Sequence, residues 1–121
     1  MKYMCLIYSP PMDQPEPQPG TPEFDAMMEP WNKANQAFID AGVMVGGDAL
    51  MPVETATTVR VRGGKTETMD GPFAETKEQL GGYYLLDCKD LDEALHFAAM
   101  IPVHEWGSAE VRPVMDLPDP G

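Results

Sequence analysis

One carboxylate stands where it could do acid–base chemistry, Asp70 at the start of the segment DGPF. A carboxylate in a loop that borders a cleft can act as a general base if burial raises its pKa toward neutrality. The same segment also forms a turn, because Gly71 tolerates the restriction before Pro72 and Phe73 can anchor the loop in the core. Asp70 is therefore a candidate base, and capping of this turn is the alternative.

Four basic side chains are candidates for binding an anionic group. Lys77 could present its charge to a substrate, although the run ETKEQ around it is typical of a solvated loop. Arg112 could bind a carboxylate or phosphate through a bidentate contact, and so could Arg60 and Arg62, which share one strand face. For all three arginines the alternative is pairing with the surplus acidic residues of the chain.

An amide and two phenols are the uncharged polar candidates. Asn35 interrupts an apolar helical stripe in a sector that also holds Trp31. A polar group there needs a partner, so Asn35 either lines a ligand pocket or is satisfied by water or backbone in the core. Tyr83 and Tyr84 place one hydroxyl on each face of a strand, where one can serve as a donor or proton carrier and both can simply pack.

The two histidines do not predict a metal site. His96 has Glu93 three positions earlier and Asp92 four positions earlier, a usable ligand spacing on a helix. That helical face is the polar one, which indicates a solvated histidine, and His104 beside Glu105 is a weak pairing. The sequence contains no Gly-rich phosphate loop, nucleophile elbow or HExxH motif. We expect no metal and no cofactor.

The elements that must position these residues follow from the apolar periodicity. They are a strand at 2–8, a helix from Thr21 to Gly42, a strand at 43–53, a hairpin at 57–69, a strand at 81–88, a helix from Asp90 to Pro102 and a strand at 108–115. The buried stripe of the second helix is expected to be Leu91, Ala94, Leu95, Ala98 and Ile101. This order predicts the split βαβ plan of a ferredoxin-like α+β sandwich with an inserted β-hairpin.

The apolar pattern of two strands also predicts a homodimer. Two helices can cover only one face of a four-stranded antiparallel sheet, yet the strands at 2–8 and 81–88 present apolar side chains to both faces. An exposed patch of that kind is unusual for a soluble monomer. We therefore expect the uncovered sheet face to pack on a second copy of the chain.

Composition limits the remaining possibilities. The 121 residues fit one domain, which we place at 1–116, followed by a Pro-rich acidic tail at 117–121. Twenty acidic residues against eight basic ones give a net charge of −12, which argues against nucleic acid and anionic membranes as partners. No apolar run is long enough for a membrane span or a signal peptide. We expect a cytoplasmic protein with Cys5 and Cys88 reduced.

The segment from DGPF through AETKEQLGGYYLLDCKDLDEAL to GSAEVRPV resembles the DGPF-type branch of the YCII-related proteins. The resemblance extends from MKYMCLIY to VRPV and implies a dimeric α/β barrel of two ferredoxin-like protomers packed sheet against sheet. The wider superfamily includes muconolactone isomerase-like enzymes and haem-degrading or quinol monooxygenases. Genes of similar proteins often lie beside those of extracytoplasmic-function sigma factors.

The sequence departs from part of this family. Shorter proteins of the YCII type carry a His–Asp pair, with the His early in the first helix, whereas residues 21–41 here contain no His. Asp70 would need a different partner. Our hypothesis is that the protein binds a small organic molecule in an apolar cleft. If the protein is an enzyme, we expect cofactor-independent proton transfer. The cleft would be lined by Trp31, Asn35, Asp70, Phe73 and a Tyr. The alternative is a non-enzymatic regulatory or accessory protein that binds a ligand or a partner such as a sigma factor.

Overall fold

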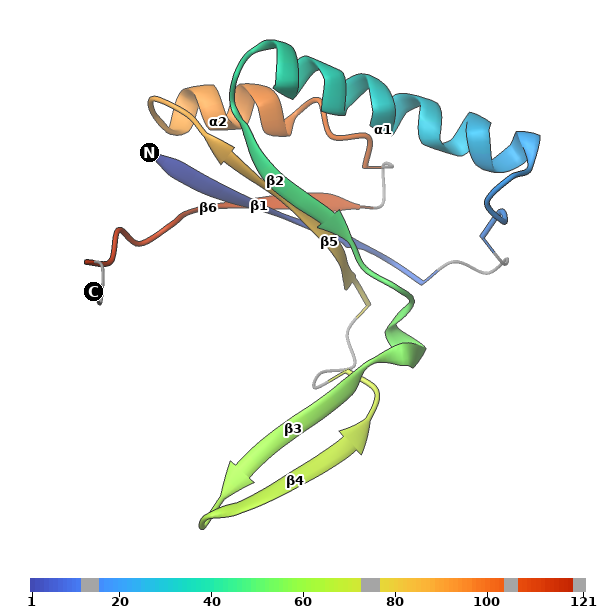
Figure 1. The fold of residues 1–121 in the computed structure, drawn as a ribbon, viewed down its shortest axis with the longest axis vertical. Coiled ribbons are helices and arrows are strands. Elements are labelled where there is room, and N and C mark those ends of the chain that lie inside the picture. Colours follow the sequence, from blue (N-terminus) through green and yellow to red (C-terminus); the bar gives the residue numbers. More distant parts are fainter. Residues whose placement is uncertain (12–15, 73–76, 104–106, 119–121) are drawn as a thin grey trace.

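The computed structural model describes residues 1–11, 16–72, 77–103 and 107–118 (Figure 1). Its elements in chain order are β1 (Lys2–Ser9), α1 (Pro22–Asp40), β2 (Met44–Ala49), a 3-10 turn (Val53–Thr55), β3 (Thr57–Arg62), β4 (Lys65–Asp70), β5 (Gln79–Asp87), α2 (Leu91–Ala98) and β6 (Ser108–Pro113). This order of strands, helices and hairpin is the one predicted from the sequence.

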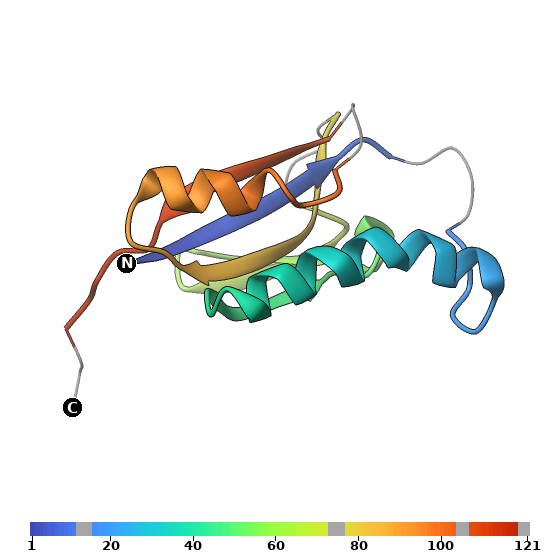
Figure 2. The ribbon, with the colours of Figure 1, turned by 90° about the horizontal axis from the view of Figure 1, so that it is seen from above.

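Four strands form one antiparallel sheet in the order β2-β5-β1-β6. A split βαβ plan produces this order, so the architecture is compatible with a ferredoxin-like fold. The hairpin β3–β4 forms a second sheet of two strands. Figures 1 and 2 show α1 and α2 on the same side of the four-stranded sheet. The predicted α+β class is confirmed.

Both helices begin at side-chain caps, at the two residues where the sequence predicts that the helices start. The Thr21 hydroxyl accepts a hydrogen bond from the Phe24 N–H at 3.2 Å, and the Asp90 carboxylate accepts one from the Glu93 N–H at 2.9 Å. These caps satisfy backbone donors that have no partner within a helix. After α1 the chain turns through Gly42, whose φ of 73° suits glycine.

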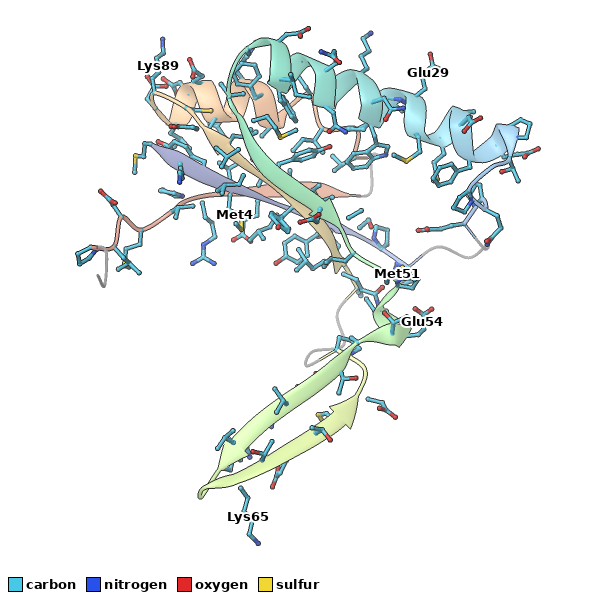
Figure 3. The ribbon with its side chains drawn as sticks, in the orientation of Figure 1. Met4, Glu29, Met51, Glu54, Lys65 and Lys89 are labelled. Atoms are coloured by element: carbon cyan, nitrogen blue, oxygen red, sulfur yellow. The ribbon has the colours of Figure 1, made fainter. Side chains whose placement is uncertain are left out.

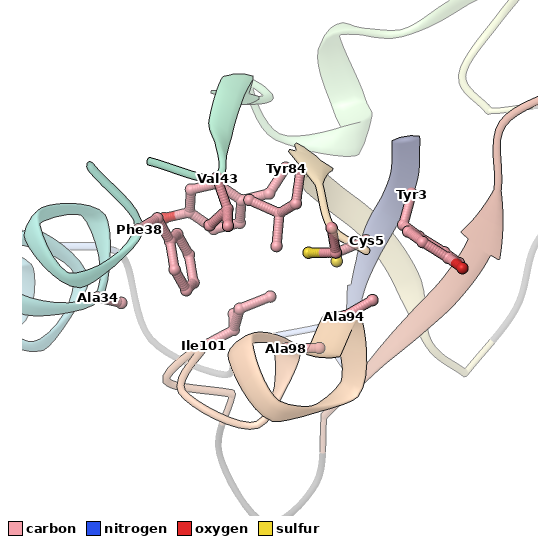
Figure 4. Packing of buried hydrophobic residues seen from close by; sticks show 11 residues of the cluster. Tyr3, Cys5, Ala34, Phe38, Val43, Tyr84, Ala94, Ala98 and Ile101 are labelled. Atoms are coloured by element: carbon pink, nitrogen blue, oxygen red, sulfur yellow. The ribbon is translucent and has the colours of Figure 1, made fainter. Parts of the chain in front are cut away.

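The core lies between the two helices and one face of the sheet (Figure 4). Phe38 of α1 is fully buried and meets the rings of Tyr84 and Phe97 edge to face, with centroids 5.2 Å and 6.0 Å away. Such aromatic pairs stabilise a core beyond their buried area. Cys5 and Cys88 belong to the same core as buried free thiols.

The predicted buried stripe of α2 is wrong in part. Ala94 and Ala98 are buried, as is Ile101 after the end of the helix, but Leu91 and Leu95 are each 48% exposed. The small alanines allow α2 to lie close to the sheet, which centres the buried face on them. At the helix's 3.6-residue period, Leu91 and Leu95 lie about 40° and 80° from that centre, both on the same side of it, and therefore toward the edge of the buried face.

The other face of the sheet is turned away from both helices, and we call it the open face. Its central side chains alternate along the strands with core residues and are half-buried: Met4, Leu6 and Tyr8 of β1 and Tyr83 and Leu85 of β5. Figure 3 shows Met4 on this side. The predicted two-faced apolar pattern of β1 and β5 is confirmed.

Within the described chain, neither helix combines the length and apolarity needed to cross a membrane.

Candidate functional site

Asp70 is the last residue of β4 and lies across from Thr57 at the base of the hairpin, with its side chain exposed. The next residue closes this base: Gly71 has a φ of 93°, its N–H donates to the Ala56 carbonyl at 2.7 Å, and its own carbonyl accepts from the Thr58 hydroxyl at 2.8 Å. A positive φ favours glycine, so Gly71 has a structural task in the turn. Phe73 lies outside the described residues.

The structure places the predicted cleft residues on two sides of the sheet. Strand β4, which ends at Asp70, lies on the side of the open face, whereas α1, which carries Trp31 and Asn35, lies on the other side (Figure 1). Within one protomer Asp70 is therefore not brought together with the two helical residues.

The basic candidates are spread over the surface. Lys77 is exposed just before β5, and Arg112 is exposed on β6 opposite Met4, at the rim of the open face. In the hairpin, Arg60 lies across from Glu67, and Arg62 lies across from Lys65. No two of these basic side chains converge on the helical side of the sheet, where Asn35 lies.

Asn35 and Tyr84 are brought together. The Tyr84 hydroxyl donates to Asn35 Oδ1 at 2.5 Å and links β5 to α1 across the edge of the core. Tyr84 is 8% exposed, and burial raises the pKa of its hydroxyl, which keeps the phenol neutral and able to donate. Of the two sequence-predicted tyrosines, Tyr84 is the one that faces the helices.

The other side of the Asn35 amide has no such partner. Among the described residues, no hydrogen-bond acceptor is found for its Nδ2–H donors. Asn35 is only half-buried, so these donors can reach a ligand or water. The side chains three and four positions away on α1 are uncharged: Trp31, Asn32, Phe38 and Ile39.

An apolar stripe runs from this amide toward the start of α1. Trp31 is half-buried and packs against the core, and it is the last side chain in that direction to do so. Phe24, Met27 and Met28 continue the stripe as half-buried side chains, and the first turns of α1 extend beyond the sheet (Figures 1 and 2). Asn35 thus lies where a packed core passes into a partly covered apolar surface.

Tyr83 forms a second polar pair, on the open face. Its hydroxyl donates to Asp48 Oδ2 at 2.8 Å, and this hydrogen bond and the negative charge of Asp48 raise the pKa of Tyr83. The two residues are cross-strand neighbours on β5 and β2. Asp48 was not predicted as a site residue; the only signal for it in the sequence is an acid in a strand, next to two glycines.

The strand pairing that orients both tyrosines depends on close backbone approach. A Cβ on Gly82 would lie 2.8 Å from the Asp48 carbonyl oxygen, and one on Gly47 would lie 2.8 Å from that of Tyr83. Real Cβ atoms do not approach backbone so closely. Gly81 has no such constraint, because its nearest neighbour would be 4.0 Å away.

No cluster of three or more potential metal ligands occurs in the described parts of the chain. His96 is exposed on α2, and His104 and Glu105 lie outside those parts.

Two comparisons with known proteins agree with the resemblance found in the sequence. The sequence model of the YCII-related domain matches residues 1–118. An uncharacterized protein of Rhizobium meliloti (strain 1021) is 44% identical to this chain over 94 residues, which cover 76% of each protein.

Proposed function

We proceed from the premise that the chain belongs to the YCII-related family, and we propose that it is a homodimer that binds a small, neutral, carbonyl-bearing organic molecule beside Asn35. The proposal rests on the hydrogen bonding of the Asn35 amide. Its Oδ1 accepts a hydrogen bond from Tyr84, while its Nδ2–H donors have no partner among the described residues. A few polar groups beside an apolar surface are typical of small-molecule sites.

The chemistry of the ligand follows from the surroundings of the amide. N–H donors suit a carbonyl oxygen, and the apolar stripe with Trp31 can bury the body of the molecule. The side chains one turn away from Asn35 are uncharged, and the chain carries a net charge of −12, which repels anions. A lactone, a quinone or an amide therefore fits better than a carboxylate.

The homodimer is proposed to form through the open face, as in a dimeric α/β barrel. Half-buried apolar side chains at its centre support this arrangement, and the charged residues Asp48 and Arg112 lie on its edge strands, β2 and β6. An apolar centre with a polar rim is the usual anatomy of an interface. Asp70 is not part of the proposed ligand site, because β4 lies on the opposite side of the sheet from α1.

A titration of ¹⁵N-labelled protein with coumarin, a neutral aromatic lactone, tests the ligand proposal. We expect the side-chain amide signals of Asn35 and the indole N–H signal of Trp31 to shift together, with benzoate far less effective. Asn35→Leu should abolish the response. Asn32→Leu is the matched control, since Asn32 is exposed on the same helix. An accessory protein without a ligand site would show no response to either probe.

A further inference from the structure

The hairpin β3–β4, residues Thr57–Asp70, stands apart from the rest of the protomer, and we call it the arm. Among the described strands, β3 and β4 pair only with each other. The arm extends away from the helices on the side of the open face, and Figure 3 shows Lys65 at its far end. An isolated two-stranded hairpin is marginally stable in water, so the arm needs packing beyond the pairing of its own two strands.

One face of the arm is uncharged over most of its length. Val59 and Val61 are 60% and 68% exposed, and their cross-strand neighbours are Thr68 and Thr66. β-branched side chains in pairs of this kind stabilise a sheet mainly when they pack against further side chains. This Val/Thr face therefore has the composition of a surface that packs on another element.

The end of the arm concentrates positive charge. Three of the eight basic residues and two of the twenty acidic ones lie in the arm, which leaves the rest of the chain with five bases and eighteen acids. Arg62 and Lys65 are direct cross-strand neighbours, and both are exposed. Like charges directly opposite each other destabilise a hairpin. An acidic surface placed against this end would remove that repulsion.

We propose that the arm of each protomer docks on the body of a second copy of this chain, with its Val/Thr face packed along the partner and its cationic end beside the partner's acidic residues. Arg62 and Lys65 lie on the opposite face of the arm from Val59 and Val61, and their long side chains reach the acidic residues from its tip. This docking rests on the homodimer part of the proposed function. Charge complementarity favours a second copy as the occupant, because the body outside the arm is strongly acidic. Packing through the open face would also bring the partner to the side from which the arm extends.

The arm is long enough for this contact. Each of its strands has six residues, which corresponds to a length of about 20 Å. Packed sheets lie about 10 Å apart, so an arm of this length can pass the partner's sheet and reach the level of its helices. The exposed residues of those helices include several acids: Glu23, Asp25, Glu29, Asp40 and Asp92.

Charge reversal at Arg62 distinguishes a docked arm from a free one, because the two predict opposite effects. If the arm is docked, Arg62→Glu turns attraction into repulsion and raises the dimer Kd by about tenfold or more. If it is free, the same change removes the repulsion with Lys65, stabilises the protomer slightly and leaves the Kd unchanged. Lys89→Glu, at an exposed base in the turn before α2, is the matched control and should change the Kd by less than about twofold.

Sedimentation velocity of the full chain over a dilution series, at 50 mM and 500 mM salt, measures these constants. The difference between wild type and Arg62→Glu should shrink at high salt. A second variant replaces 58–69 by Asn-Gly, joining Thr57 and Asp70, which are neighbours across the arm; its dimer should also be at least about tenfold weaker. If the wild type dimerises but neither variant changes the dimer Kd, the docking of the arm is overturned and the homodimer is not. A wild-type monomer at every concentration overturns the proposed homodimer as well.

Discussion

The hydrogen bond between Tyr84 and Asn35 can be removed from either end or from both. Tyr84→Phe keeps the edge-to-face contact of the ring with Phe38 at 5.2 Å and removes only the hydroxyl. This loss of one neutral hydrogen bond should lower the free energy of unfolding by about 1 kcal/mol. Asn35→Leu leaves the Tyr84 hydroxyl, in a side chain that is 8% exposed, without its partner, at a cost of about 1–3 kcal/mol. Burial of the leucine beside Trp31 offsets part of that cost.

The double variant should be close to wild type in stability, because both polar groups are gone. The cycle therefore predicts a favourable coupling of about 1–2 kcal/mol between the two residues. Urea unfolding of the four proteins at one fixed protomer concentration measures it, since dimerisation makes stability depend on concentration. In thermal unfolding, 1 kcal/mol corresponds to about 4 °C in a chain of this size.

The double variant should keep near-wild-type stability but lose coumarin binding, so its coumarin titration should show no response. Additive single effects, with a coupling below about 0.3 kcal/mol, would show that the hydrogen bond does not join α1 to β5 in solution. Unchanged coumarin binding by the double variant would refute the assignment of the ligand site.

Three further predictions follow from the packing. Leu6→Arg at the centre of the open face should weaken the dimer, because it removes an apolar side chain from the proposed interface. The lost burial is about half that of a fully buried leucine, about 1–1.5 kcal/mol per protomer and about 2–3 kcal/mol for the dimer. The dimer Kd measured by sedimentation should therefore rise by about 30- to 150-fold. Leu95→Arg on exposed α2 should leave the Kd unchanged, and equal effects would contradict the open-face interface. Burial raises the pKa of the Cys5 thiol from its ordinary 9.0 to about 11, so the thiol stays neutral in the fold while it ionises in the unfolded chain, and on the order of 2–3 kcal/mol of stability is lost as pH rises from 9 to 11. Urea unfolding across that range should show a smaller loss for Cys5→Ala, and equal losses would count against a buried neutral thiol. Gly82→Ala should lower stability by at least about 1 kcal/mol in urea, because its Cβ would meet backbone at 2.8 Å, whereas Gly81→Ala should be nearly neutral; the reverse order would contradict the strand register.

Local rules accounted for the starts of the helices and for the two-faced strands, whereas α2 ends at Ala98, four residues before the predicted end at Pro102. The cap at Thr21 depends on residues three positions apart, and the pattern of β1 depends on simple alternation, so both are visible in the sequence. The buried stripe of α2 was predicted less well. The apolar periodicity defines only a broad sector of the helix, and packing against the sheet determines which part of that sector is buried. Leu91 and Leu95 lie at the edge of that sector.

The candidate site depended on long-range register, which the sequence does not contain. The Tyr83–Tyr84 pair indicates one hydroxyl on each face, but only the position of the helices decides which one meets Asn35. Similarly, Asp48 faces Tyr83 because the pairing of β2 with β5 shifts between Met44 and Gly46. A register shift of one residue reverses the side that each side chain faces, so neither pair could be derived from local spacing.

The most direct test of the account is where a bound probe lies. A filtered NOE spectrum of ¹³C,¹⁵N-labelled protein with unlabelled coumarin reports which side chains contact the ligand. We predict contacts to the Trp31 indole and to the methyl groups of Met27 and Met28, on the helical side of the sheet. Contacts to the open-face methyl groups of Leu6 and Leu85, or to no defined set of side chains, would contradict it.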